Sequence, residues 1–177
     1  MRVSGLVVFP AVLFACSAAE VAPTAAVAPA TPVRHLPPID LEQGERPSDC
    51  NIENPGAWDP MLAAVQSAGT APVVTRGKQG IAETVALADG SEVRVVRGGC
   101  QHVGETWSVT PVPVGPHIAA VRAMIGKLAL APEKTSSLLP CLDDARDAEP
   151  AGFACREANV SRAVQGDVLE FTWSFAL

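Results

Sequence analysis

Residues 81–97 read IAETVALADGSEVRVVR, and this stretch decides the fold. Its two apolar-rich halves, 81–87 and 92–97, flank an Asp-Gly pair, which is a strong signal for a tight turn between strands. In the second half, Val93 and Val95 occupy alternate positions, so one face of that strand is expected to be buried. The stretch therefore predicts an antiparallel hairpin within a larger sheet.

Further strands are expected on both sides of this hairpin. Residues 71–76 precede it, and residues 105–110, with Trp107 directed inward, follow it. The alternation of apolar residues near the C-terminus predicts a second hairpin, formed by 154–164 and 168–175. Its last strand carries large apolar side chains at alternate positions: Leu169, Phe171, Trp173 and Phe175. Burying each of them would contribute roughly 1.5–3 kcal/mol before entropy is counted, so this strand is expected to be essential.

Helical patterns separate the strands. One helix is expected over 59–69, because Asp59 suits the N-cap and Pro60 suits the first helical position. A stronger helix is expected over 116–131, where apolar residues recur at helical spacing, and 136–148 has room for a short one. The predicted fold class is α+β: an antiparallel sheet of about five strands with two or three helices packed on it. A β-sandwich fits less well, because helices interrupt the strands.

Composition excludes two classes of protein. The 177 residues suit one domain, and the formal net charge of −6 argues against a nucleic-acid partner. Hydrophobic residues make up 48% and charged residues 18%, which excludes disorder over the full length.

An apolar run opens the chain. Arg2 precedes residues 6–14, a run that suits a signal peptide but is too short to span a bilayer. The run ends in Leu13-Phe14-Ala15-Cys16, which resembles the lipobox of bacterial lipoproteins, with the bulky Phe14 as the one departure.

This resemblance implies that residues 1–15 are removed as a signal peptide and that Cys16 becomes a lipidated N-terminus, carrying diacylglycerol and an acyl chain such as palmitate. The chain would then be anchored to a membrane of the bacterial cell envelope. Ser17, in place of Asp, favours the outer membrane, facing the periplasm. The alternative is an ordinary secretory peptide that is cut after Ala18 or Ala19.

Composition divides the rest of the chain. Residues 16–47 hold the lipidated Cys16 and an Ala- and Pro-rich linker, which is expected to be extended. His35 lies in this linker and is expected to be solvated. Residues 48–177 are expected to form a single globular domain.

Four cysteines remain once Cys16 is assigned to the lipid: Cys50, Cys100, Cys141 and Cys155. An even number in an exported chain predicts two disulfides, for which three pairings exist. The short segment between Cys141 and Cys155 closes readily, and that bond would contribute roughly 3 kcal/mol. We therefore expect these two to pair, and Cys50 to pair with Cys100. No Cys-x-x-Cys spacing indicates a zinc site.

One pattern suggests nucleophilic catalysis. Cys100 is followed two residues later by His102, and either His102 or His117 could activate its thiol. No third, orienting group can be named, and His102 is expected at the surface. We therefore expect no catalytic residue.

A second pattern suggests cation binding. An acidic cluster around Arg146 comprises Asp143, Asp144, Asp147 and Glu149. Its spacing matches no EF-hand loop, so a solvated loop is expected instead. The chain has no G-x-G-x-x-G, P-loop or H-E-x-x-H motif, and no cofactor or metal is expected.

Residues 87–93 and 98–102 resemble small secreted or lipid-anchored bacterial proteins of unassigned role, and this resemblance supplies no catalytic residue. The expected function is that of a lipid-anchored, non-catalytic envelope protein that binds another envelope protein or a cell-wall component. Such a role includes inhibition of a basic wall hydrolase, which an acidic domain would suit. The alternative is a small envelope hydrolase with an unrecognised site. The sequence leaves the oligomeric state open.

Overall fold

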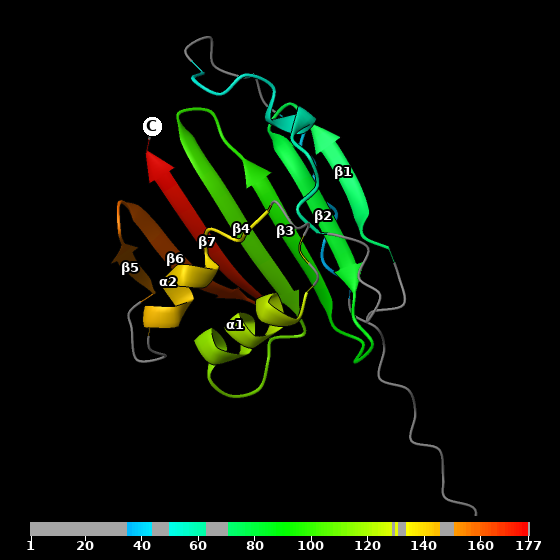
Figure 1. Ribbon diagram of the computed structural model, residues 1–177. Helices are drawn as coiled ribbons and strands as arrows, with labels where there is room; N and C mark the ends of the chain where they lie inside the picture. The colour runs from blue at the N-terminus through cyan, green and yellow to red at the C-terminus, as the bar shows by residue number, and fades with distance from the viewer. Residues whose placement is uncertain are drawn as a thin grey trace, which may run out of the picture. The chain divides into compact units, whose positions relative to one another are not determined.

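Seven β-strands form one antiparallel sheet within the described part of the chain, in the spatial order β1-β2-β3-β4-β7-β6-β5 (Figure 1). The computed structural model describes residues 35–43, 50–62, 71–128, 130, 134–145 and 151–176. The strands are β1 (Val73–Gly77), β2 (Gly80–Ala86), β3 (Glu92–Gly98), β4 (His102–Thr110), β5 (Gly152–Cys155), β6 (Ala158–Gln165) and β7 (Val168–Ala176). The helical elements in the same residues are η1, a 3-10 turn (Pro55–Ala57), α1 (His117–Lys127) and α2 (Leu139–Asp144).

The fold class expected from the sequence is wrong in its proportions. The sequence predicts an α+β fold with about five strands and two or three helices, whereas the described residues hold seven strands and only two short α-helices. Part of the difference lies in 154–164, which was expected to be one strand. Arg156 adopts a left-handed backbone conformation with φ of 58° and turns the chain between β5 and β6, so the segment is a hairpin.

The helix expected over 59–69 is absent where the structure describes it, at 59–62. Leu62 instead forms an isolated antiparallel β-bridge with Leu130. This tertiary pairing outweighs the local helix signal of the Asp-Pro pair. Residues 63–70 lie outside the described part.

The other two expected helices are present, although the first is shorter than expected. Helix α1 begins as expected but ends at Lys127, because Leu128 already has extended backbone angles. Its buried residues, Ile118, Val121 and Ile125, fall at the expected helical spacing. Helix α2 is the short helix for which 136–148 has room.

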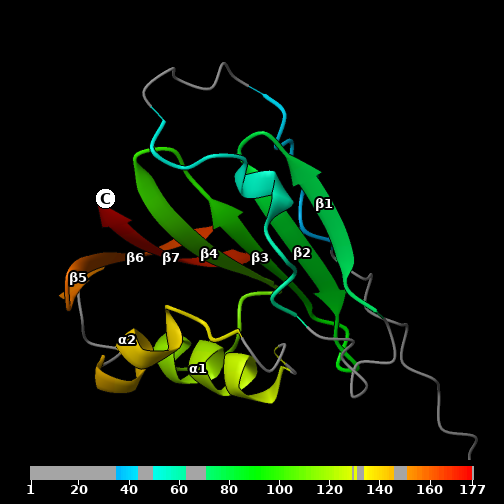
Figure 2. The same cartoon turned by 45° about the horizontal axis from the view of Figure 1, so that its top comes forward.

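The hydrophobic core lies between one face of the sheet and the two α-helices, which share that face (Figure 2). Trp107 has no exposed surface, which confirms its inward orientation. Leu169 and Phe171 are also fully buried. Trp173 and Phe175 on the same strand are only half-buried. The apolar face of β7 therefore contributes to the core only in the first half of the strand.

Residues 35–43, here called the N-terminal strap, pack on the opposite face of the sheet. They belong to the stretch expected to be an extended linker, yet Leu36 and Leu41 are buried. The backbone N–H of Leu36 donates to a carboxylate oxygen of Glu92 at 3.0 Å, and His35 Nδ1 lies 2.8 Å from the other. His35 is exposed, as expected, but it is paired. The strap is therefore fixed by a carboxylate as well as by apolar burial.

The disulfides follow the expected pairing. Cys50 is bonded to Cys100, and Cys141 is bonded to Cys155. The first bond joins the start of the second described segment to the β3–β4 turn. The second joins α2 to β5 and so connects the helical layer to the sheet.

Candidate functional site

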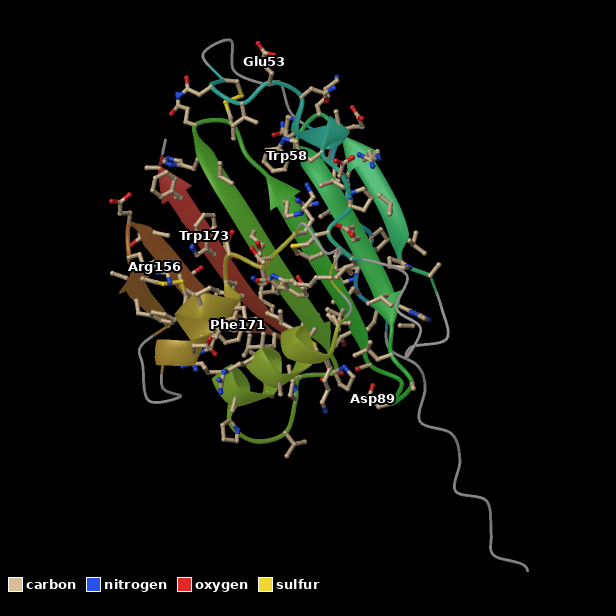
Figure 3. All side chains as sticks on the ribbon, viewed as in Figure 1. Glu53, Trp58, Asp89, Arg156, Phe171 and Trp173 are labelled. Carbon is tan, nitrogen blue, oxygen red and sulfur yellow. A yellow bond between two sulfur atoms is a disulfide. The ribbon has the colours of Figure 1, made fainter. Side chains whose placement is uncertain are left out.

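A cavity of about 140 Å³ opens on the helix-bearing face of the sheet. Its lining residues are Trp58, Met61, Arg97, Val103, Gly104, Glu105, Lys134, Thr135, Ser137 and Trp173. Figure 3 shows Trp58 and Trp173 toward the end of the sheet that α1 leaves uncovered, whereas Phe171 lies beside the helices. We call this cavity the Trp58–Trp173 pocket.

Residues 56–62 form one wall of the pocket. Arg76 on β1 donates to the carbonyl oxygens of Gly56 and Trp58 at 2.6 and 2.8 Å. A Cβ atom at Gly56 would lie 2.3 Å from the carbonyl oxygen of Gly77, so only glycine lets η1 approach β1 this closely. The backbone that carries the Trp58 ring is thus fixed against the edge of the sheet.

A buried ion pair between Glu83 and Arg97 holds the backbone of the same wall. Glu83 on β2 has no exposed surface, and its carboxylate accepts the N–H groups of Met61 and Leu62 at 2.8 and 2.7 Å. Arg97 on β3 lies 3.3 Å from Glu83 Oε1, and its Nη2 donates to the carbonyl oxygen of Asp59 at 2.5 Å. The Nε atom of Arg97 is buried and has no hydrogen-bond acceptor among the described residues. Arg97 therefore has one buried donor without a partner among these residues.

A second buried carboxylate holds the opposite lip. Glu105 on β4 is 3% exposed and is the cross-strand partner of Arg97. It accepts hydrogen bonds from Trp107 Nε1 at 2.6 Å, from Ser136 Oγ at 2.5 Å, and from the backbone N–H groups of Ser137 at 3.0 Å and Leu138 at 3.4 Å. A carboxylate has about four acceptor positions, and with three donors on Oε1 and one on Oε2 Glu105 has little acceptor capacity left.

The remaining lining groups leave an aromatic wall and a free cation. Trp173 stacks on Phe175 with ring centroids 6.4 Å apart, which orients its indole at the end of β7. Lys134 is half-buried at the lip and forms no ion pair with a described residue.

This chemistry suits binding better than proton transfer. The carboxylates of Glu83 and Glu105 are occupied by donors that hold the walls, so neither is poised to accept a proton from a substrate. By contrast, Arg97 has a donor without an acceptor among the described residues, and Lys134 forms no ion pair with any of them. Two half-buried indoles add apolar contact area, as is typical of recognition sites.

The thiol suggested by sequence as a nucleophile is not available. Cys100 is bonded to Cys50, so its sulfur carries no thiolate while that bond persists. His102 is exposed at the start of β4, as expected, and His117 begins α1 at the opposite end of that strand. The structure does not bring the three groups together.

The acidic cluster is only partly described. Asp143 forms an ion pair with Arg122 of α1. The side chain of Asp144 and residues 146–150, which include Asp147 and Glu149, lie outside the described residues. Among the residues that are described, no group of three metal-ligating side chains occurs. Cys16 also lies outside the described part.

A larger depression, of about 360 Å³, lies over β5 and β6. It is lined by small, apolar and neutral polar residues with no charged side chain. Its polar lining groups are neutral, whereas the smaller pocket also carries charged ones, so the smaller pocket is the better candidate.

The pocket was not expected from the sequence, although the strands carry a signal for it. Glu83, Arg97 and Glu105 occupy inward positions in strands, alternating with the exposed face at the same spacing as Val95 and Trp107. Burying a charge on an inward face costs free energy unless the charge is paired. A charged residue at such a position therefore indicates either a buried ion pair or a binding site.

The chain matches no protein-family model, and comparisons with curated proteins and with solved structures found no similar protein. Among the described residues, no helix is long and apolar enough to cross a membrane.

Proposed function

We propose that the chain is a lipid-anchored, non-catalytic binding protein of the bacterial cell envelope, and that the Trp58–Trp173 pocket is its ligand site. The observation that carries the binding role is the unequal state of the polar groups in this pocket. Glu105 already accepts four hydrogen bonds, while Arg97 has a donor without an acceptor among the described residues and Lys134 forms no ion pair with them. Such a pocket is shaped to receive a group that accepts hydrogen bonds.

The rigidity of the walls supports the same role. The backbone of 56–62 is held by Arg76, Glu83 and Arg97, and that of 136–138 is held by Glu105. A wall fixed before binding loses little conformational entropy when a ligand arrives. The structural use of the buried carboxylates also argues against the alternative of a hydrolase, which needs a free base.

The anchor and the envelope location rest on the lipobox-like Leu13-Phe14-Ala15-Cys16. Two disulfides agree with export to an oxidising compartment. Lipid must supply the membrane attachment, because a chain with a net charge of −6 gains nothing from anionic head groups.

The anchor is tested by Cys16→Ala. The unmodified chain is expected to partition into detergent and to acquire acyl label, and the variant is expected to do neither. A variant that still fractionates with membranes would show that attachment occurs elsewhere.

The binding role is tested by affinity capture from solubilised envelopes. The pocket variant carries Trp58→Ala and Lys134→Gln, and the control carries Val114→Ala and Lys127→Gln, because Val114 and Lys127 are exposed residues outside the pocket lining. We expect the unmodified chain and the control to retain the same ligand and the pocket variant to lose it. Equal capture by all three, with matching unfolding midpoints, would contradict the proposed site. Turnover of a wall or protein substrate by the purified chain would favour the hydrolase.

A further inference from the structure

We infer that the ligand group held by the Trp58–Trp173 pocket is a peptide carboxylate, with Arg97 and Lys134 as its charged partners. This inference rests on the proposed function and names the chemistry of its ligand. It follows from the hydrogen-bonding capacity left in the pocket, its charges and its size.

The unused hydrogen-bonding capacity of the charged lining groups is mostly on the donor side. Glu105 already receives four donors, three on Oε1 and one on Oε2, so it has little acceptor capacity left. Arg97 Nε is buried without an acceptor, and a buried unsatisfied donor of a charged group is unusual and costly. A ligand that accepts hydrogen bonds therefore suits the charged groups of this pocket.

The unused donors are also cationic. Arg97 is partly neutralised by its ion pair with Glu83, and Lys134 forms no ion pair with any described residue. The side chain of Arg97 is only 14% exposed, so an ion pair made there is weakly screened. A carboxylate matches a guanidinium in charge and in geometry, and it accepts from an ammonium at the same time.

The walls and the size of the pocket point to a single residue. Its volume of about 140 Å³ is below the range typical of sites that enclose a whole cofactor. Trp58 and Trp173 provide apolar contact for a small aliphatic group next to the carboxylate. A short aliphatic residue that carries a carboxylate meets both requirements.

The test uses the indole N–H resonances of the ¹⁵N-labelled full chain in detergent. The chain has three tryptophans, so the spectrum is simple, and Trp58→Phe and Trp173→Phe assign the two pocket signals. The probes are N-acetyl-Ala-Ala with a free carboxylate and its C-terminal amide. We expect the acid to shift both pocket signals with a Kd in the millimolar range, and the amide to bind at least about tenfold more weakly.

Lys134→Gln is expected to weaken binding of the acid by up to about fivefold, as for one partly screened ion pair, and the matched Lys127→Gln is expected to leave it unchanged. D- and L-forms of the acid distinguish the two sources of such a group, a cell-wall peptide and a protein. The inference is overturned if the amide binds as well as the acid, if inorganic phosphate or a chitin oligosaccharide binds more tightly than the acid, or if no shift occurs up to about 10 mM. Any of those results could occur together with loss of envelope capture in the pocket variant. In that case the pocket would still be a binding site, and only the assignment of a carboxylate as its ligand would be wrong.

Discussion

Replacing Glu83 by Gln is the most informative test of how the pocket is built. Glu83 has no exposed surface and receives three donors: the N–H groups of Met61 and Leu62 and Nη2 of Arg97. Glutamine has nearly the same shape, but only its carbonyl oxygen accepts. Its amide group would point a donor at one of those three donors, and the charge that balances Arg97 would be gone.

The expected cost follows from these contacts. A hydrogen bond to a charged group contributes about 1.5–3 kcal/mol, and removing one partner of a buried ion pair costs about 3–5 kcal/mol. Because the two effects share the same atoms, they do not add, and we expect Glu83→Gln to lower the free energy of unfolding by about 3–5 kcal/mol. That is a large part of the stability of an ordinary domain.

Urea unfolding of the oxidised full chain, followed by tryptophan fluorescence, measures this cost. The matched control is Glu42→Gln, whose carboxylate is 61% exposed and lies 4.0 Å from Lys78. The control is expected to change the free energy by less than about 0.5 kcal/mol. A loss below about 1 kcal/mol for Glu83→Gln would refute the idea that this carboxylate fixes the pocket wall.

Three further predictions concern other parts of the sheet. Phe171→Ala should lower the free energy of unfolding by about 3–5 kcal/mol, because its ring is fully buried, and thermal unfolding would measure the loss. Ser91 donates its hydroxyl and its N–H to the carboxylate of Asp89, and these bonds hold the pKa of Asp89 below its ordinary value of 3.8. Their contribution to stability is therefore complete above pH 3.8 and is lost as the pH falls through the lowered pKa, and Ser91→Ala should raise that pKa in an NMR titration. Glu92→Gln should speed hydrogen exchange at the N–H of Leu36 while the sheet stays protected, because the N-terminal strap loses its carboxylate acceptor.

The local elements could be predicted from the sequence because their signals are local. The hairpin 81–97 combines a period-two pattern with an Asp-Gly turn, and the structure places β2 and β3 there. The disulfide pairing was predictable because one pair of cysteines lies close together in the sequence, which leaves the other pair by exclusion.

The strand count could not be predicted in the same way. The β5–β6 turn contains Arg156 in a left-handed conformation, which carries no glycine or asparagine signal. The expected helix does not begin at Asp59, because Leu62 pairs with Leu130, which is distant in the sequence. The burial of Leu36 and Leu41 likewise depends on a sheet face that composition alone does not reveal.

The pocket depends on contacts between distant segments. Glu83 and Glu105 hold residues that lie 21–22 and 31–33 positions away in the sequence. Their inward position could have been predicted from strand alternation, but many of their partners are backbone groups in segments without periodicity. The sequence could therefore indicate where a buried charge lies, but not which wall it holds.

The claim that the Trp58–Trp173 pocket binds an envelope ligand is tested most directly by photocrosslinking in living cells. A photoreactive phenylalanine derivative replaces Trp58 in one strain and the fully exposed Val114, which lies outside the pocket lining, in another. We predict a discrete adduct from position 58, reduced by the additional substitution Lys134→Gln, and none from position 114. Equal adducts from the two positions, or adducts from position 114 alone, would contradict the claim.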